Sequence, residues 1–252
     1  MYKWNEMTRD DFNKIAEEAI VILPIGAVEQ HGPHLPVMTD VAIVNEIARK
    51  SGEKTAKQEP VVLGPTIPFG FSHHHLIYPG TLSLSSNTLL LVLKELLESV
   101  VKSGFKKMFI INGHGGNDEI IQLAARNAAV DYNVTVGAAS YWSIASDTIK
   151  NYCEKHHLSP APGHAGQFET SLMLVIYPEL VKLAKLVNAN PRRNPLEIDL
   201  LSSNVRIEKP SVWKDIDGFT DDPDSAFAER GKELIELITD EVARCLIEFG
   251  KL

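Results

Sequence analysis

The sequence contains little cysteine and no long hydrophobic run. Cys153 and Cys245 are the two cysteines among 252 residues, and they do not form a Cys-x-x-Cys arrangement. This number is too small for a disulfide framework, so a reducing compartment is expected. Apolar runs such as residues 19–25 are much shorter than the roughly 20 residues that a membrane-spanning helix requires. Residues 1–11 lack the basic start and apolar core of a signal peptide. We therefore predict a cytoplasmic protein without a membrane partner.

Basic residues are also scarce. The chain has 25 Lys and Arg against 33 Asp and Glu, which gives a formal net charge of −8. Nucleic-acid backbones are bound by clustered basic side chains, so this balance argues against a nucleic-acid partner. The one compact basic pair, Arg192 and Arg193, lies between two prolines and is typical of a solvated loop. A small polar substrate fits this composition better.

The apolar residues are distributed as in a layered α/β protein. Hydrophobic residues make up 44% of the chain, enough for one substantial core, and we predict a single domain over residues 1–252. The predicted strands cover residues 19–26, 60–64, 108–112 and 134–140. The predicted helices cover residues 40–51, 87–103, 117–131, 166–177 and 227–249. This alternation predicts a three-layer α/β/α sandwich with a mainly parallel sheet. The irregular stretch 188–224, which contains Trp213 and Phe219, is expected to form a folded cover or a subunit contact.

Three potential metal ligands follow the first predicted strand. Glu29 and His31 are two positions apart, so in an extended segment their side chains point to the same side. Asp40 comes nine positions after His31, at the start of a predicted helix. The loop between them could return the Asp40 carboxylate to the same place, where it could bridge two cations. We also predict that Thr39 or Asp40 caps this helix.

The third predicted strand ends in a second candidate block, Asn112-Gly113-His114-Gly115-Gly116-Asn117. His114 lies beyond the carboxyl end of the strand, which is where open parallel sheets bind ligands. The glycines allow close approach of the backbone. A histidine in such a place is more often a hydrogen-bonded loop residue, so His114 is significant only together with the other candidates.

The last two candidates flank the start of the predicted helix 166–177. His164 comes just before this helix, and Glu169 lies in its first turns. Taken alone, Glu169 is better explained as an acid that stabilises a helix N-terminus. Taken together, histidine and carboxylate ligands without thiolate suit zinc, manganese or iron and disfavour a structural zinc site of the cysteine type.

The sequence around these candidates resembles the signature blocks of the creatininase family. The resemblance covers residues 15–185, with the blocks in the family's order. The blocks are Glu29-Gln30-His31-Gly32-Pro33-His34-Leu35-Pro36 with Thr39-Asp40, then Ser72-His73-His74-His75-Leu76-Ile77-Tyr78-Pro79-Gly80-Thr81, then Asn112-Gly113-His114-Gly115-Gly116-Asn117, and Glu169-Thr170-Ser171.

The resemblance implies a metal-dependent amidohydrolase that acts on carbon–nitrogen bonds other than peptide bonds. It implies a homohexamer with two divalent metal ions per chain, zinc, manganese or iron, and a small cyclic or formyl-amide substrate. Asp40 would bridge the ions. Glu29 and His114 would complete one metal site, and His31 and Glu169 would complete the other.

Further residues match positions near the family's substrate. His164 matches the catalytic histidine, which would transfer a proton to the leaving nitrogen. His75 would bind substrate or stabilise the oxyanion, with Ser72 beside it, and Asn117 could hydrogen-bond the substrate. Trp142 matches an aromatic residue near the family's pocket. Simple loop packing of His75 and a core position for Trp142 are the alternatives. The run of three histidines at 73–75 could also be a surface metal site.

Three positions depart from creatininase itself, and they bear on the substrate. Gly116 replaces a glutamate ligand, Gly163 replaces a glutamate before the catalytic histidine, and Pro160 replaces a tryptophan that closes over creatinine. The departures predict that creatinine is a poor substrate. Deformylases of pyrimidine intermediates and hydrolases of keto-inositols share the Asn-Gly-His-Gly-Gly-Asn block, so both substrate classes stay open. A non-catalytic, metal-bound oligomer that binds a metabolite is the alternative outside the enzymes.

Overall fold

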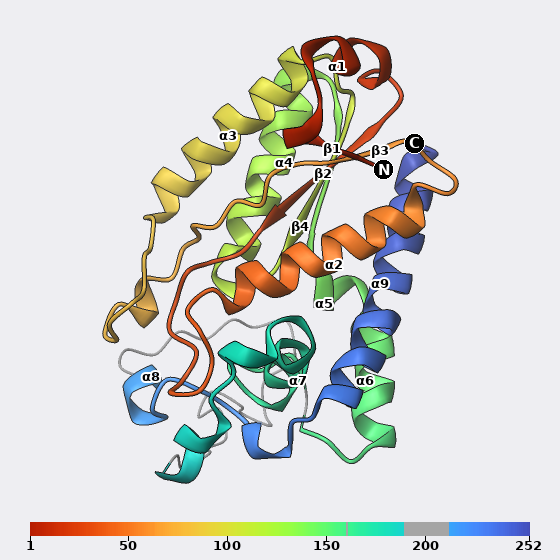
Figure 1. Ribbon diagram of the computed structural model, residues 1–252. Helices are drawn as coiled ribbons and strands as arrows, with labels where there is room; N and C mark the ends of the chain where they lie inside the picture. The colour runs from red at the N-terminus through yellow and green to blue at the C-terminus, as the bar shows by residue number, and fades with distance from the viewer. Residues whose placement is uncertain (160, 189–211) are drawn as a thin grey trace.

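The structure is a computed structural model that describes residues 1–159, 161–188 and 212–252. The position of Pro160 and the basic pair Arg192 and Arg193 therefore lie outside the described residues. The described chain forms a parallel sheet with helices on both faces (Figure 1). The predicted three-layer α/β/α sandwich is confirmed.

The sheet brings the ends of two central strands to one edge. Its strands are β1 (Tyr2–Lys3), β2 (Ile20–Ile25), β3 (Val61–Leu63), β4 (Lys107–Asn112) and β5 (Thr135–Ser140), in the order β1-β3-β2-β4-β5. All pairings are parallel. Every residue of β2 is buried, as expected for a strand covered on both faces. The register pairs Ile25 of β2 with Asn112 of β4, so the segments that follow both strands begin side by side.

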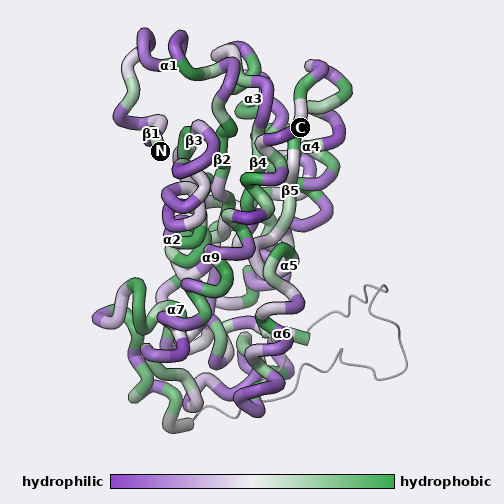
Figure 2. The backbone as a smooth tube through the Cα atoms, turned by 90° about the vertical axis from the view of Figure 1, so that its right-hand side faces the viewer, coloured by the Kyte–Doolittle hydropathy of each residue, from purple (hydrophilic) through white to green (hydrophobic). Residues whose placement is uncertain are grey.

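Alternate residues of β2 supply two separate cores. Ile20 and Ile22 face the layer that contains α2 (Thr39–Thr55), α7 (Gln167–Ile176) and α9 (Ala228–Gly250). Val21 and Leu23 face the layer of α3 (Ser86–Lys102) and α4 (Asp118–Tyr132). Figure 1 shows these two layers on opposite sides of the strands, and the inner strands are largely hydrophobic in Figure 2. Each fully buried Ile or Leu contributes about 1.5–3 kcal/mol relative to an exposed one.

The remaining helices include several that the periodicity did not predict. They are α1 (Arg9–Ile15), α5 (Tyr141–Ile144), α6 (Ser146–Lys155) and α8 (Val212–Asp215). One of the short 3₁₀ helices, η2, covers His73–His75. The start of α1 carries a capping box between Thr8 and Asp11, a signal that is readable in the sequence. No helix of the described ranges is both long and apolar enough to cross a membrane.

The predicted cap of α2 is wrong. Met38 is the N-cap residue and makes no side-chain capping bond. The Thr39 hydroxyl donates to the carbonyl of Pro36 at 2.7 Å, so it is not available as a cap. Asp40 lies in the first turn of α2, and its carboxylate contacts His31 instead of the helix backbone. The N-terminus of α2 therefore lacks a side-chain cap, and the Asp40 carboxylate points toward His31 at the end of the sheet.

Candidate metal centre

The structure brings all five predicted metal ligands together at the carboxyl edge of the sheet. Glu29 and His31 follow β2, His114 follows β4, Asp40 begins α2, and Glu169 lies in the first turn of α7. All five are nearly inaccessible, with exposed fractions between 0% and 5%. So many polar groups are rarely buried together unless they are paired or coordinate a metal.

The first ligand set consists of Glu29, Asp40 and His114. One potential ligand atom from each lies within 4.8 Å of the others. Nδ1 of His114 is 3.3 Å from Glu29 Oε1 and 3.2 Å from Asp40 Oδ2. Nε2 of His114 lies 3.0 Å from the carbonyl of Phe71, to which it donates. A neutral His114 therefore presents the lone pair of Nδ1 to the two carboxylates.

The second ligand set shares Asp40 with the first and adds His31 and Glu169. Nε2 of His31 is 3.0 Å from Asp40 Oδ1 and 3.7 Å from Glu169 Oε2. Nδ1 of His31 donates to the backbone carbonyl of Glu29 at 3.1 Å, which again leaves the other ring nitrogen for a ligand. Such bonds to the far nitrogen are what orients a metal-binding histidine. Asp40 thus points one oxygen at each set.

The chemistry of these atoms fits divalent cations. Both carboxylate oxygens of Glu29 and Oδ2 of Asp40 are buried without a hydrogen-bond partner among the described residues. An unsatisfied buried carboxylate carries a large desolvation cost, because its charge has left water without compensation. A cation between the facing lone pairs of Asp40, Glu29 and His114 would remove this cost. Nitrogen and oxygen donors of this kind suit zinc, manganese or iron.

The ionisation of the cluster reflects the same concentration of negative charge. Burial opposes a charge on His31, but Asp40, Glu169 and Glu29 raise its pKa to about 10. Burial also opposes a charge on His114, whose pKa is nevertheless raised well above the usual value by Glu29 and Asp40. Burial raises the pKa of Glu169 to about 7. Without a cation, protons therefore occupy the places that metal ions would take.

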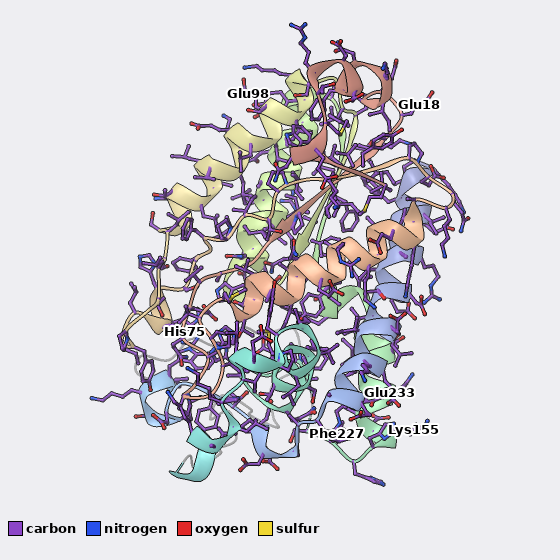
Figure 3. The ribbon with its side chains drawn as sticks, in the orientation of Figure 1. Glu18, His75, Glu98, Lys155, Phe227 and Glu233 are labelled. Atoms are coloured by element: carbon purple, nitrogen blue, oxygen red, sulfur yellow. The ribbon has the colours of Figure 1, made fainter. Side chains whose placement is uncertain are left out.

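Two further histidines, His75 and His164, lie near Glu29, but their pKa values are lowered instead of raised. Nε2 of His75 and Nδ1 of His164 are each 3.6 Å from Glu29 Oε1. Burial lowers the pKa of His75 to about 3, although Glu29 acts in the other direction. Burial, followed by the charges of His31 and His75, lowers the pKa of His164 well below its usual range. Both rings are therefore neutral at pH 7. Figure 3 labels His75 near the carboxyl edge of the sheet.

Two residues predicted to contact substrate, Ser72 and Asn117, make hydrogen bonds to the loops around the ligands. Ser72 is fully buried, and its hydroxyl lies 3.2 Å from Nε2 of His114. Asn117 is also fully buried; its amide donates to the carbonyl of Gly26 at 3.1 Å and accepts from the amide of Phe71 at 2.9 Å. Neither residue lines the cavity beside the ligands. Their geometry indicates that they hold neighbouring loops in place.

A cavity of about 220 Å³ opens beside the two ligand sets. His164 and Trp142 line it, together with Asp118, which the sequence analysis did not select. Asp118 accepts a hydrogen bond from the side chain of Asn112 at 3.0 Å, so its position depends on the block after β4. His75 is only 1% exposed and does not line this cavity, although it reaches Glu29.

Trp213 is a second residue that sequence reasoning did not place at the site. Its ring centroid is 4.4 Å from that of His75 and 5.0 Å from that of His164. The Tyr78 hydroxyl donates to its backbone carbonyl at 3.0 Å. Trp213 lies in the irregular stretch that was predicted to form a cover, and there it packs on the histidines. The sequence could not predict this contact, because residue 213 is far from residues 75 and 164 along the chain and no local motif links them.

Comparison with known proteins relates this arrangement to a family. The family model for creatininase, described as creatinine amidohydrolase, matches residues 5–246. The chain belongs to the creatininase family. It is therefore a metal-dependent hydrolase of carbon–nitrogen bonds, in agreement with the clustered histidine and carboxylate ligands.

Individual relatives of the creatininase family match most of the chain. A creatinine amidohydrolase from Pseudomonas putida is 27% identical over 248 residues, which covers 92% of this chain and 90% of the relative. A mycofactocin precursor peptide peptidase from Mycobacterium ulcerans is 32% identical over 230 residues, which covers 89% and 83%. A solved structure of creatininase with manganese has a TM-score of 0.80 at 24% identity over 98% and 97% of the two chains, which supports the fold.

The backbone explains two of the departures from creatininase itself. A Cβ atom added at Gly116 would lie 2.2 Å from the carbonyl oxygen of Phe71, so no side chain fits there. Gly163 has a φ of +61°, and a Cβ atom there would lie 1.9 Å from the Asp221 carboxylate. A glutamate at position 116 would require the backbone of Phe71 to move, and one at position 163 would require the Asp221 side chain to turn away and a strained backbone. The loops at Gly116 and Gly163 therefore pack in a way that favours glycine at both positions.

Proposed function

We propose that this chain hydrolyses a small polar cyclic amide or formamide with two divalent cations bound at the candidate metal centre. The bond cleaved is a carbon–nitrogen bond other than a peptide bond, as in creatininase-type amidohydrolases. The observation that carries this proposal is the pair of buried ligand sets that share Asp40.

Each ion has its own residues in this proposal. Glu29 and His114 would hold one ion, His31 and Glu169 would hold the other, and Asp40 would contribute one oxygen to each. Zinc, manganese and iron all suit these donors. Bound there, divalent cations would polarise the substrate carbonyl and activate water for attack at neutral pH.

The two neutral histidines, His164 and His75, transfer a proton and donate a hydrogen bond to the reacting atoms, respectively. His164 lines the cavity and has Nδ1 directed to the Glu29 carboxylate, so it can take a proton and transfer it to the leaving nitrogen. His75 reaches the same carboxylate with Nε2 and can donate to oxygen. Trp142 forms part of the cavity wall against which a flat substrate would lie.

The size of the cavity favours a small substrate. Pockets for drug-sized ligands enclose about 300–1,000 Å³, and this cavity encloses about 220 Å³. A single ring or a formamide group fits within this space. A keto-inositol is another small polar ring, and it stays an alternative because the cavity offers both acidic and aromatic walls.

A second candidate substrate is a longer amide with an apolar part. A groove of about 460 Å³ shares Trp142 and Pro162 with the lining of the cavity. Ile149, Leu158 and Ala161 add apolar surface to the groove. A substrate that extends beyond the reacting amide could place its apolar part there. A relative that is named as a peptidase of a precursor peptide is consistent with this candidate, in which the bond cleaved would be a peptide bond instead.

Catalysis by this family favours an enzyme over the non-catalytic metabolite-binding oligomer. The homohexamer, the cytoplasmic location and the single-domain organisation remain predictions. Light scattering of the purified protein would test the hexamer directly.

A substrate screen tests the proposed function. The protein, reconstituted separately with zinc, manganese and iron, is assayed against cyclic amides, formamides, keto-inositols and apolar amides, with creatinine for comparison. Release of amine, formate or acid is the readout. We expect turnover of a small amide with a kcat/KM of at least about 10⁴ M⁻¹s⁻¹ and a much lower value for creatinine. Turnover of keto-inositols alone would reject the amidohydrolase assignment, and efficient creatinine turnover would show that Gly116 and Gly163 do not restrict the substrate.

A further inference from the structure

The side chain of Gln30 lies between the two neutral histidines of the site. It is 6% exposed, and its neighbours Glu29 and His31 are both proposed ligands. Its amide nitrogen is 2.9 Å from Nδ1 of His75 and 3.2 Å from Nε2 of His164. No role in the reaction has been given to Gln30 so far, yet it contacts both rings that face the Glu29 carboxylate.

Two backbone groups fix the orientation of the Gln30 amide. Its Oε1 accepts from the amide of Gly32 at 3.0 Å, and its Nε2 donates to the carbonyl of Gly218 at 2.6 Å. A backbone amide can only donate and a carbonyl can only accept. Rotating the Gln30 amide by 180° would therefore break both bonds, and the assignment does not depend on the histidines.

The orientation of Gln30 determines the tautomer of His75. An amide nitrogen offers only hydrogens, so Nδ1 of His75 must accept from Nε2 of Gln30. A neutral His75 then carries its hydrogen on Nε2, the atom 3.6 Å from Glu29 Oε1. His75 presents an N–H group to the metal centre.

The backbone carbonyl of Gln30 determines the tautomer of His164. It lies 3.0 Å from Nε2 of His164 and can only accept, so this nitrogen carries the hydrogen. Nδ1 of His164, 3.6 Å from the same Glu29 oxygen, then presents a lone pair. The two hydrogens of the Gln30 amide are used by Gly218 and His75, so its 3.2 Å approach to His164 is a packing contact.

We propose that Gln30 is a positioning residue that makes His75 a hydrogen-bond donor and His164 a proton acceptor toward the reacting atoms. This inference rests on the proposed function for its catalytic consequence. His164 takes a proton from the attacking water at Nδ1 as the carbon–oxygen bond forms, while His75 donates to the carbonyl oxygen. His164 then gives that proton to the leaving nitrogen as the carbon–nitrogen bond breaks. One water is consumed, and both rings return to their starting tautomers.

Two substitutions test the role of the side chain. Gln30→Glu keeps an acceptor for the amide of Gly32 but has no hydrogen for His75 or Gly218. Gln30→Met removes the donor without adding charge beside Glu29. Both leave the backbone carbonyl that holds His164 in place, so His164 serves as the internal control.

The first readout does not require a substrate. Histidine-labelled, metal-free protein is examined by ¹⁵N NMR, with His75→Ala and His164→Ala used to assign the signals. We expect hydrogen on Nε2 of both rings in the wild type. In Gln30→Glu, hydrogen should appear on Nδ1 of His75, and His164 should be unchanged. Hydrogen on Nδ1 of His75 in the wild type, or no change of the His75 signals in either variant, would overturn the proposal.

The second readout is catalytic and uses whichever substrate the screen finds. Removing one donor to a developing oxyanion costs about 10²- to 10³-fold in kcat, and we expect Gln30→Met to lower kcat about 100-fold. KM should change less than about threefold, and the metal content should equal that of the wild type. Unchanged kcat with full metal content would overturn the catalytic part. If no amide is turned over by the wild type, the proposed function fails, whereas the NMR result still decides the tautomers.

Discussion

The two sides of the cavity are built from different kinds of structure. On the metal side, Glu29, Asp40 and His114 are almost completely buried and lie within 4.8 Å of one another. Elsewhere in the lining, Trp142 and Asp118 are partly exposed, and Trp142 also lines the groove along α6. The sheet edge thus fixes the reactive chemistry, whereas shorter, more exposed segments shape the space for substrate. Such a division allows a fold to keep one reaction while its substrates change.

The largest expected effect comes from removing the ligand that both sets share. Asp40→Ala should abolish binding of both ions, with affinity reduced by more than about 100-fold, since even residues that only support ligands cost about 10- to 100-fold. Elemental analysis of the purified variant would measure this. Asp147→Ala, at an exposed acid of the groove, is the matched control and should keep full metal content. Retention of both ions by Asp40→Ala would remove the proposed bridge.

A loss of catalysis without a loss of metal is expected at the boundary between the two sides. His164 lines the cavity but belongs to neither ligand set that contains Asp40. His164→Ala should lower kcat by about 100- to 10,000-fold, the usual contribution of a positioned acid or base. Its metal content should stay that of the wild type. An unchanged rate would exclude His164 from proton transfer.

The affinity of the metal centre for a cation should depend strongly on pH. The carboxylates raise the pKa of His31 to about 10 despite its burial, and burial raises the pKa of Glu169 to about 7. A cation must displace both protons below pH 7 but only the His31 proton between pH 7 and pH 10. Affinity at this site should therefore rise about 100-fold per pH unit below pH 7 and about tenfold per unit above it. Titrations with manganese from pH 6 to pH 9 would measure both slopes. An affinity independent of pH would contradict the cited pKa shifts.

The smallest effect is expected at the aromatic wall. Aromatic contacts contribute about 0.5–1.5 kcal/mol, so Trp142→Ala should raise KM about 2- to 10-fold. Trp142 belongs to neither ligand set. We therefore expect kcat to change less than about threefold and both ions to stay bound. Loss of metal from Trp142→Ala would show that the two sides of the cavity are not independent.

The sequence predicted the metal side of the site much better than the wall. The period of apolar residues and the glycines after β2 and β4 indicated a parallel sheet, and parallel strands end at one edge. That edge is where Glu29, His31 and His114 meet. Asp40 comes only nine positions after His31, so the sequence predicted that its carboxylate lies near His31. The predicted cap at the start of α2 was wrong.

Contacts between distant segments could not be predicted in the same way. Trp213 packs on His75, and the Gln30 amide donates to Gly218, across 138 and 188 positions respectively. No local pattern encodes such pairs, since they depend on how the whole chain packs. Ser72 and Asn117 were predicted to contact substrate because their motifs lie near the site. Both side chains are fully buried, and their contact with substrate stays a prediction.

The central claim is that two cations share Asp40 at the edge of the sheet. Anomalous diffraction from crystals of the protein loaded with manganese or zinc tests it most directly. The account predicts two peaks separated by roughly 3.5–4 Å, one beside Glu29 and His114 and the other beside His31 and Glu169, with Asp40 between them. A single peak, or peaks at His73 and His74 of η2 with none at Asp40, would contradict it.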